Sequence, residues 1–234
     1  MGGSRSPAMQ WGTRAAPAML LWMTAALALS ACVQTDGNNF STTYVDQFAT
    51  PNPTLAEFPV CHGFGCTIVS RGSLSKDEWA RVRAAFRPQA KDAKAERQQI
   101  ARALALTQTL VGPKTGTAAR QWTHKDLYVL PNNGDPTQRD CIDEAVNTWT
   151  YMTLMERDGL FQFHRVAKLA HVGLLPDLNV RNTAVVQDKS GSYFAIDPSL
   201  VDHGVPPPVM PLETWLGPWP PDIKASDARA EARR

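Results

Sequence analysis

Asp-Cys-Ile-Asp-Glu-Ala, at residues 140–145, begins a predicted helix whose first residue is Cys141. Asp140 is suited to the N-cap and Asp143 stands three positions further on, so backbone N–H groups converge near the sulfur. Asp158-Gly159 predicts a left-handed end of this helix. Between Cys141 and that end, apolar residues recur at helical spacing: Ile142, Ala145, Val146, Trp149 and Met152. The helix dipole lowers the pKa of a thiol at this position, whereas the two carboxylates oppose that effect. Cys141 is therefore a candidate nucleophile, with a small buried helix-capping side chain as the alternative.

The other three cysteines have structural explanations. Cys32 ends Leu-Ser-Ala-Cys at residues 29–32, which resembles the lipobox of bacterial lipoproteins. Residues 1–31 hold Arg5 and Arg14, no acid, and an uncharged apolar stretch, as expected of a signal peptide that is removed before a lipid is attached to Cys32. A short anchor helix with an incidental cysteine is the alternative. By resemblance to lipoprotein sorting signals, Val33 after the cysteine favours the periplasmic face of the outer membrane, with the acyl chains as the attachment.

Removing residues 1–31 changes the charge balance from 24 basic and 22 acidic side chains to 22 of each, because the segment contains two arginines. A neutral mature protein argues against a nucleic-acid partner. We expect four segments: the signal peptide at 1–31, a flexible lipid-anchored tether at 32–57, a domain at 58–222 and a disordered charged tail at 223–234.

Cys61-His-Gly-Phe-Gly-Cys66 joins the expected tether to the domain. In an oxidising envelope the two thiols should form a disulfide, contributing about 2 kcal/mol by chain entropy. A metal site with His62 as a third ligand is the alternative, but no second pair of ligands has suitable spacing elsewhere. We therefore expect no metal and no cofactor.

The remaining pattern predicts helices first and an antiparallel sheet afterwards, which is an α+β domain. A capping box at Ser75 begins one helix that ends before Pro88, and a longer helix runs from about Pro88 to Val111 with Gly112-Pro113 as its stop signal. Strands are predicted at 127–130, 161–170, 180–187 and 192–197, with a hairpin turn at Asp188–Gly191. The proline-rich stretch from Pro206 to Pro211 is expected to end regular structure.

The helix-opening cysteine and the later hairpin resemble the transglutaminase-like, papain-related cysteine enzymes. More closely, the chain resembles a group of uncharacterised proteobacterial envelope proteins of that kind. This resemblance covers about Phe58 to Trp215 and is carried by four stretches: Cys61–Cys66, Asp140–Ala145, Thr183–Val186 and Tyr193–Asp197. The resemblance implies N-terminal helices packed on a small antiparallel sheet, in a transglutaminase-like or papain-like core.

By this resemblance Cys141 is the nucleophile and Asp197 orients the catalytic base. The histidine that serves as base is expected two residues before the Thr-Ala-Val run, and this chain has Arg181 there. An arginine does not accept the thiol proton at neutral pH. With the turn centred on Lys189 and Ser190, Arg181 and Asp197 should share one face of adjacent strands and could form a salt bridge.

Another histidine would be needed as base if the site is active. His171 is the first choice and His203 the second, although a strand residue and a solvated turn residue are the plainer interpretations. His164, on the same strand as His171, and His124, before the 127–130 run, have no identified role. Gln138 is a candidate oxyanion donor because it is close to Cys141 in sequence.

Two functions follow. The first is a transglutaminase-like domain that has lost its catalytic histidine and serves as a lipid-anchored binding or scaffolding module in the cell envelope. The second is a thiol hydrolase or acyltransferase that acts on peptide amide bonds through Cys141, with a base from elsewhere in the chain. In both, the partners are the membrane, through the N-terminal lipid, and an envelope peptide or protein.

Overall fold

The hairpin formed by β6 (Arg181–Asp188) and β7 (Tyr193–Ile196) is the centre of the larger sheet in the computed structural model. The structure describes Gly2 and residues 40–41, 43–50, 52–118, 136–173 and 181–218. Gln187 pairs with Tyr193, so the turn is centred on Ser190 and is one residue longer than predicted. The longer turn is stabilised by the Asp188 carboxylate, which accepts hydrogen bonds from the main-chain N–H of Ser190 and of Ser192.

The sheet has the order β1-β5-β6-β7-β8 among the described residues, and β4 also pairs with β6. The predicted strand at 161–170 is present as β4 (His164–Val166) and β5 (Leu169–Val172). Val166 of β4 pairs with Val186, and Ala170 of β5 pairs with Thr183. The chain thus advances by four residues from β4 to β5 while β6 advances by three. The extra residue makes a β-bulge at 167–169, which bends the strand and separates β4 from β5.

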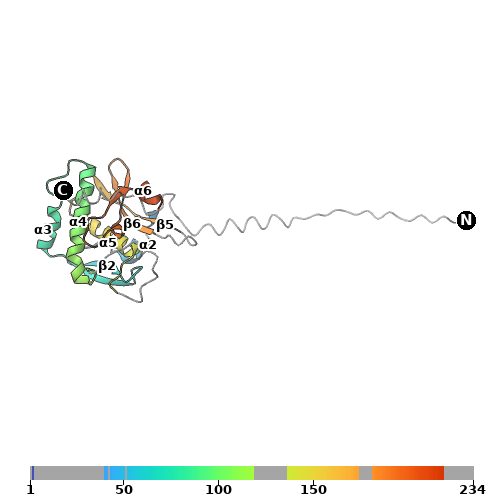
Figure 1. Ribbon diagram of the computed structural model, residues 1–234, viewed down its shortest axis with the longest axis horizontal. Coiled ribbons are helices and arrows are strands. Elements are labelled where there is room, and N and C mark those ends of the chain that lie inside the picture. Colours follow the sequence, from blue (N-terminus) through green and yellow to red (C-terminus); the bar gives the residue numbers. More distant parts are fainter. Residues whose placement is uncertain are drawn as a thin grey trace. The chain divides into compact units, whose positions relative to one another are not determined.

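Three helices are layered beside the sheet (Figure 1): α5 (Cys141–Arg157) packs on β6, α4 (Ala93–Thr115) packs on α5, and α3 (Lys76–Ala84) packs on α4. The predicted capping boxes at Ser75 and Asp140 are both present, and the helix at Cys141 is confirmed. The stop signal at Gly112-Pro113 was wrong, because α4 continues to Thr115 and ends at Gly116, whose φ of 74° is left-handed. A proline so close to the C-terminus disturbs only the last turn, and the helix carries it.

The described residues between Phe40 and Glu57 contradict the prediction of a flexible tether for this part of 32–57. β1 (Phe40–Ser41) pairs with β5, α2 (Thr43–Phe48) packs on α5, and the main-chain carbonyl of Leu55 accepts a hydrogen bond from Leu74. Apolar residues recur at helical spacing over α2 and the residue that follows it, namely Tyr44, Val45, Phe48 and Ala49, all partly buried on the core. Six residues are too few for that period to stand out in the sequence.

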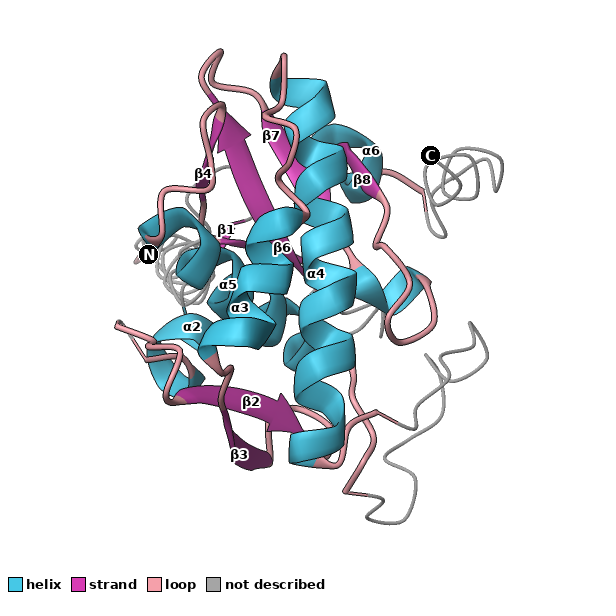
Figure 2. Ribbon diagram, turned by 90° about the vertical axis from the view of Figure 1, so that its left-hand side faces the viewer, coloured by secondary structure: helices cyan, strands magenta, loops and turns pink. Residues whose placement is uncertain are grey.

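A second hairpin was also missed by the sequence analysis. β2 (Phe58–His62) and β3 (Ile68–Gly72) form a separate two-stranded sheet, which Figure 2 shows at the opposite end of the helices from β4, β6 and β7. The prediction that regular structure ends at the prolines was wrong too. β8 (Val209–Pro211) pairs with β7 as an edge strand, where proline is tolerated, and α6 (Leu212–Leu216) follows.

Two apolar clusters lie on the two faces of the larger sheet. Ala184, Val186 and Ile196 belong to the main core with Ala145 and Val146 of α5, while Val185 and Ala195 pack with Trp215 of α6. Even-numbered residues of β6 therefore face α5 and odd-numbered residues face α6. The α+β class predicted from the sequence is confirmed.

All the described helices and strands belong to one unit, Asp36–Arg234; the other unit, Met1–Thr35, is outside the described residues except for Gly2. The predicted signal peptide at 1–31, the strand at 127–130 and the tail at 223–234 are likewise outside them. In the part of the chain that is described, no helix has the length and apolar character needed to cross a membrane.

Candidate thiol site

The N-terminus of α5 places Cys141 at the edge of the helix that packs against β6. The Asp140 carboxylate accepts hydrogen bonds from the main-chain N–H of Ile142 and Asp143, each at 3.0 Å. The Asp143 carboxylate in turn accepts from the main-chain N–H of Asp140 at 3.0 Å. Because both residues cap the same turn, the position of the cysteine is well determined.

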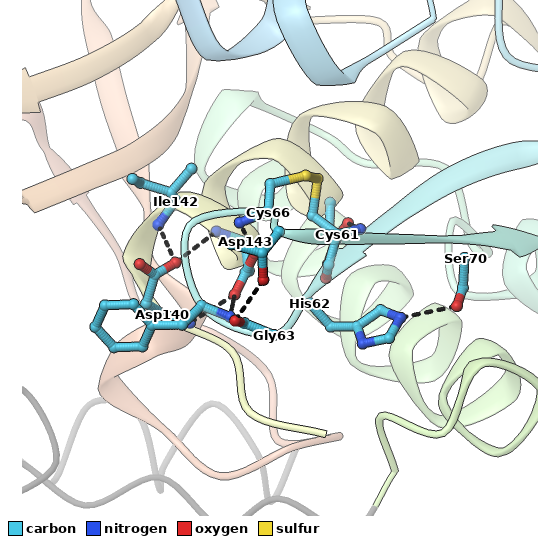
Figure 3. The surroundings of a disulfide bond; sticks show 11 residues. Cys61, His62, Gly63, Cys66, Ser70, Asp140, Ile142 and Asp143 are labelled. Atoms are coloured by element: carbon cyan, nitrogen blue, oxygen red, sulfur yellow. Dashed lines mark hydrogen bonds between the residues drawn. A yellow bond between two sulfur atoms is a disulfide. The ribbon is translucent and has the colours of Figure 1, made fainter. Parts of the chain in front are cut away.

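Asp143 also binds the turn at residues 63–66, as Figure 3 shows. Gly63, Phe64, Gly65 and Cys66 all have positive φ, between 56° and 81°. Successive left-handed residues point their N–H groups to one side and form an anion-binding concavity. Phe64 and Cys66 donate their main-chain N–H to the Asp143 carboxylate at 3.2 and 2.6 Å. Burial and the Asp140 carboxylate nevertheless raise the pKa of Asp143 to about 8.

The disulfide between Cys61 and Cys66 is confirmed, with 4.6 Å between the two Cα atoms. It closes the left-handed turn that binds Asp143. Asn147, one turn further along α5, holds the other end of the loop, because its side-chain amide accepts from the N–H of Cys61 at 2.7 Å and donates to its carbonyl at 2.8 Å. This role of Asp143 and Asn147 was not predicted from the sequence, although their four-residue spacing on one helix face is visible there.

The sulfurs of Cys61 and Cys66 and the carboxylate of Asp143 are close enough to share a metal ion. The disulfide removes the two thiolates that such a site needs, and the Asp143 oxygens accept main-chain N–H groups. His62 does not join this cluster, since its ring contacts the Ser70 hydroxyl at 2.7 Å and the Pro136 carbonyl. In this form the loop is a structural clamp on α5.

Cys141 is half-buried and lies outside the disulfide, and the side-chain amide of Asn182 lies 3.6 Å from its sulfur. Burial and the Asp140 carboxylate raise the pKa of Cys141 to about 12. The opposition predicted for the Asp140 carboxylate is thus present, and desolvation of the thiolate, which the sequence did not reveal, is the larger cause. Tyr44 of α2 lies near the thiol. Burial raises the pKa of its phenol, and the negative charge of a Cys141 thiolate would raise it further. The thiol is neutral at physiological pH.

Arg181 and Asp197 do share one face of the hairpin, but it is the face away from α5. The Arg181 guanidinium lies 5.1 Å from the centre of the Trp215 ring. The Asp197 carboxylate accepts hydrogen bonds from the Trp215 indole at 2.7 Å and from the Ser199 hydroxyl at 2.5 Å. Both side chains are described by the structure, and they do not form an ion pair with each other. The predicted salt bridge between Arg181 and Asp197 was therefore wrong.

The β6 residue that faces the thiol is Asn182, which the sequence analysis did not consider. Asn182 and Arg181 are neighbours, so their side chains point to opposite faces of the strand. Asn182 also binds His171, directly opposite on β5: the His171 Nδ1 lies 2.9 Å from the Asn182 Oδ1. Of the candidate bases, His171 is therefore connected to the thiol, with the Asn182 amide between the imidazole and the sulfur.

His203 belongs to a different polar cluster. Its Nδ1 lies 3.1 Å from Arg139, which forms a buried ion pair with Glu144 at 3.1 Å. Gln108 of α4 completes the cluster by donating to Glu144 at 3.2 Å. Burial and the Arg139 charge lower the pKa of His203 to about 4, so it is neutral at physiological pH.

The other candidates are placed as follows. His164 is buried and contacts the Glu96 carboxylate at 2.9 Å, and Glu96 also accepts from three consecutive main-chain N–H groups, those of Gln162, Phe163 and His164. This is a structural anchor for β4. Gln138 accepts from Gly63 through its main-chain carbonyl at 2.6 Å, and an oxyanion role for its side chain stays a prediction. His124 and Cys32 are outside the described residues.

Comparisons of the chain with models of protein families, with curated proteins and with solved structures found no match.

Proposed function

We propose that this protein is a lipid-anchored envelope protein whose transglutaminase-like domain has a thiol site without turnover and serves as a binding or scaffolding module. One observation carries the proposal: the side chain that β6 presents to the Cys141 sulfur is the amide of Asn182. An amide neither removes the thiol proton nor returns one to a leaving group, and acyl transfer requires both steps.

The surroundings of the thiol support this proposal. Arg181 and Asp197, at the positions that the resemblance assigns to the base and its orienting residue, face Trp215 on the other side of the sheet. The neutral state of Cys141 at physiological pH also leaves it a weak nucleophile.

A surface hollow next to the bulge supports the binding role. A hollow of about 520 Å³ lies between α2, α5 and the bulge, and its lining includes Val45, Trp149, Glu156 and Lys168. A second hollow, of about 370 Å³, is lined by the same bulge residues together with Phe40 and Tyr193. Volumes of this size and a mixture of aromatic and charged side chains suit a segment of an envelope peptide.

The competing function is a thiol hydrolase or acyltransferase, and it is favoured by the His171 contact with Asn182. A turnover assay separates the two. The mature protein is incubated with fluorogenic peptide amides and thioesters, and Cys141→Ala serves as the matched control. The proposal expects no product above the control at any pH from about 5 to about 10. Product that depends on Cys141 would establish the enzyme instead.

A further inference from the structure

The first strand of the domain begins close, along the chain, to the proposed lipid anchor. β1 starts at Phe40, eight positions after Cys32, and pairs with β5. Eight residues span at most about 29 Å, because one residue of a fully extended chain covers at most about 3.6 Å. A tether that ended at Glu57, as the sequence predicted, would reach about 90 Å. The pairing of β1 with β5 therefore keeps the face of the domain around Phe40 near the membrane that holds the lipid.

Phe40 also lines the smaller of the two hollows beside the bulge. This hollow, of about 370 Å³, is on the face of the sheet that packs on α6, because Phe40 and Tyr193 both pack against the apolar cluster around Trp215. The two rings are in contact, with 4.9 Å between their centroids. The larger hollow is on the opposite face, since its lining includes Trp149 of α5. The chain from the lipid anchor thus enters the domain at the smaller hollow.

The lining of the smaller hollow is positively charged. Its charged side chains are Arg165 and Lys168, both exposed, and the rest of the lining is aromatic, aliphatic or amide. The Arg165 Nε donates to the side-chain oxygen of Gln187 at 2.8 Å, which orients the guanidinium beside the hollow. The larger hollow differs, because its lining holds the carboxylates of Asp46 and Glu156. Of the two, only the smaller hollow suits an anionic ligand.

We propose that this face is a membrane-contact surface, on which Arg165 and Lys168 bind the phosphate groups of anionic phospholipids. Arginine pairs with phosphate through parallel charge-assisted hydrogen bonds, and cations near an anionic bilayer are attracted to it. The adjacent rings of Phe40 and Tyr193 fit the headgroup region, where one end of a tyrosine is in an apolar and the other in a wet environment. The electrostatic attraction falls off within about 10 Å, so it depends on the short reach from Cys32.

This inference rests on the proposed function in one respect, because the lipid on Cys32 brings the surface to the bilayer. It refines that function by giving the two hollows different partners. The smaller hollow faces lipid, whereas the larger one, on the other side of the sheet, stays open to an envelope peptide. A short covalent link gives an effective concentration in about the millimolar range, so two weak phosphate contacts are sufficient to orient the domain.

The test is vesicle sedimentation of the mature protein carrying Cys32→Ser, which measures the surface without the acyl chains. The vesicles are phosphatidylcholine alone or an equimolar mixture of phosphatidylcholine and phosphatidylglycerol. The protein should bind the anionic vesicles more tightly, and Arg165→Gln combined with Lys168→Gln should weaken that binding by about tenfold or more. Added sodium chloride should weaken it too.

Arg71→Gln combined with Lys76→Gln is the matched control. It also removes two exposed cations, and Arg71 is on β3, at the opposite end of the helices from β4 (Figure 2). This control should bind the anionic vesicles within about twofold of the unaltered surface. Inorganic phosphate, added at the concentration of the lipid phosphate, should not displace the vesicles.

Equal binding to the two kinds of vesicle would overturn the proposal, as would anionic binding that survives the loss of Arg165 and Lys168. Displacement by inorganic phosphate would also overturn it, because the hollow would then be an ion site and not a membrane surface. A failed proposed function gives different results: a mature N-terminus without acyl groups by mass spectrometry, or Cys141-dependent product in the peptide assay.

Discussion

Asn182 donates its side-chain amide to the sulfur of Cys141, 3.6 Å away, across the interface between β6 and α5. Its neighbour Arg181, which the sequence resemblance puts in the place of the base, lies over Trp215 on the opposite face of the same strand. The alternation of side chains along one strand therefore decides which residue meets the thiol.

Asn182→His should restore a base where Arg181→His should not. An imidazole at position 182 would contact the Cys141 sulfur directly and stabilise the thiolate, so alkylation at neutral pH should become at least about tenfold faster. Arg181→His would place its imidazole near Trp215 and Asp197, and the rate should stay within about twofold of the unmodified protein. Alkylation followed by peptide mapping measures both. Faster alkylation in Arg181→His alone would show that β6 has a different register from the one described.

The Cys61–Cys66 disulfide should leave one free thiol in the unlipidated mature domain. Thiol counting under denaturing conditions measures this, and Cys141→Ala, which removes the remaining thiol, should reduce the count to zero. Replacing both Cys61 and Cys66 with serine should lower the free energy of unfolding by about 2 kcal/mol, because the left-handed turn that binds Asp143 is no longer closed. A count of three in oxidatively prepared protein would contradict the pairing.

His203 should make the domain less stable in acid. Burial and Arg139 lower its pKa from 6.5 to about 4, so the unfolded chain takes up the proton first. Its contribution to stability is present above about pH 6.5 and is lost as the pH falls toward about 4. Urea unfolding across this range should show the loss, and His203→Gln should show a smaller one. An identical pH dependence in the two proteins would mean that His203 is accessible to protons in the folded state.

Cys32 should be acylated and should hold the protein in the envelope membrane fraction. The uncharged apolar stretch before Leu-Ser-Ala-Cys motivates this prediction. Cys32→Ser should release the protein or block processing of the precursor, as seen by fractionation and by mass spectrometry of the mature N-terminus. An unmodified protein that stays in the cytoplasm would rule out the anchor.

Local signals in the sequence were sufficient for several elements because their causes are local. The capping boxes at Ser75 and Asp140 depend on residues three positions apart, and the disulfide depends on two cysteines five positions apart. The β6–β7 hairpin was visible from its turn and alternating pattern, although its length was misjudged by one residue because Asp188 accepts two main-chain N–H groups across the turn.

The sequence by itself determined the α+β order, the start of α5 at Cys141 and the pairing of Cys61 with Cys66. The surroundings of the thiol were decided only by tertiary structure, since Cys141 and Asn182 are 41 residues apart and meet where α5 packs on β6. Packing also raises the pKa of Cys141, because burial and the Asp140 carboxylate both oppose the thiolate. Local sequence specifies where a nucleophile stands on its helix, whereas its partners and its charge depend on which faces of distant strands the fold brings to it.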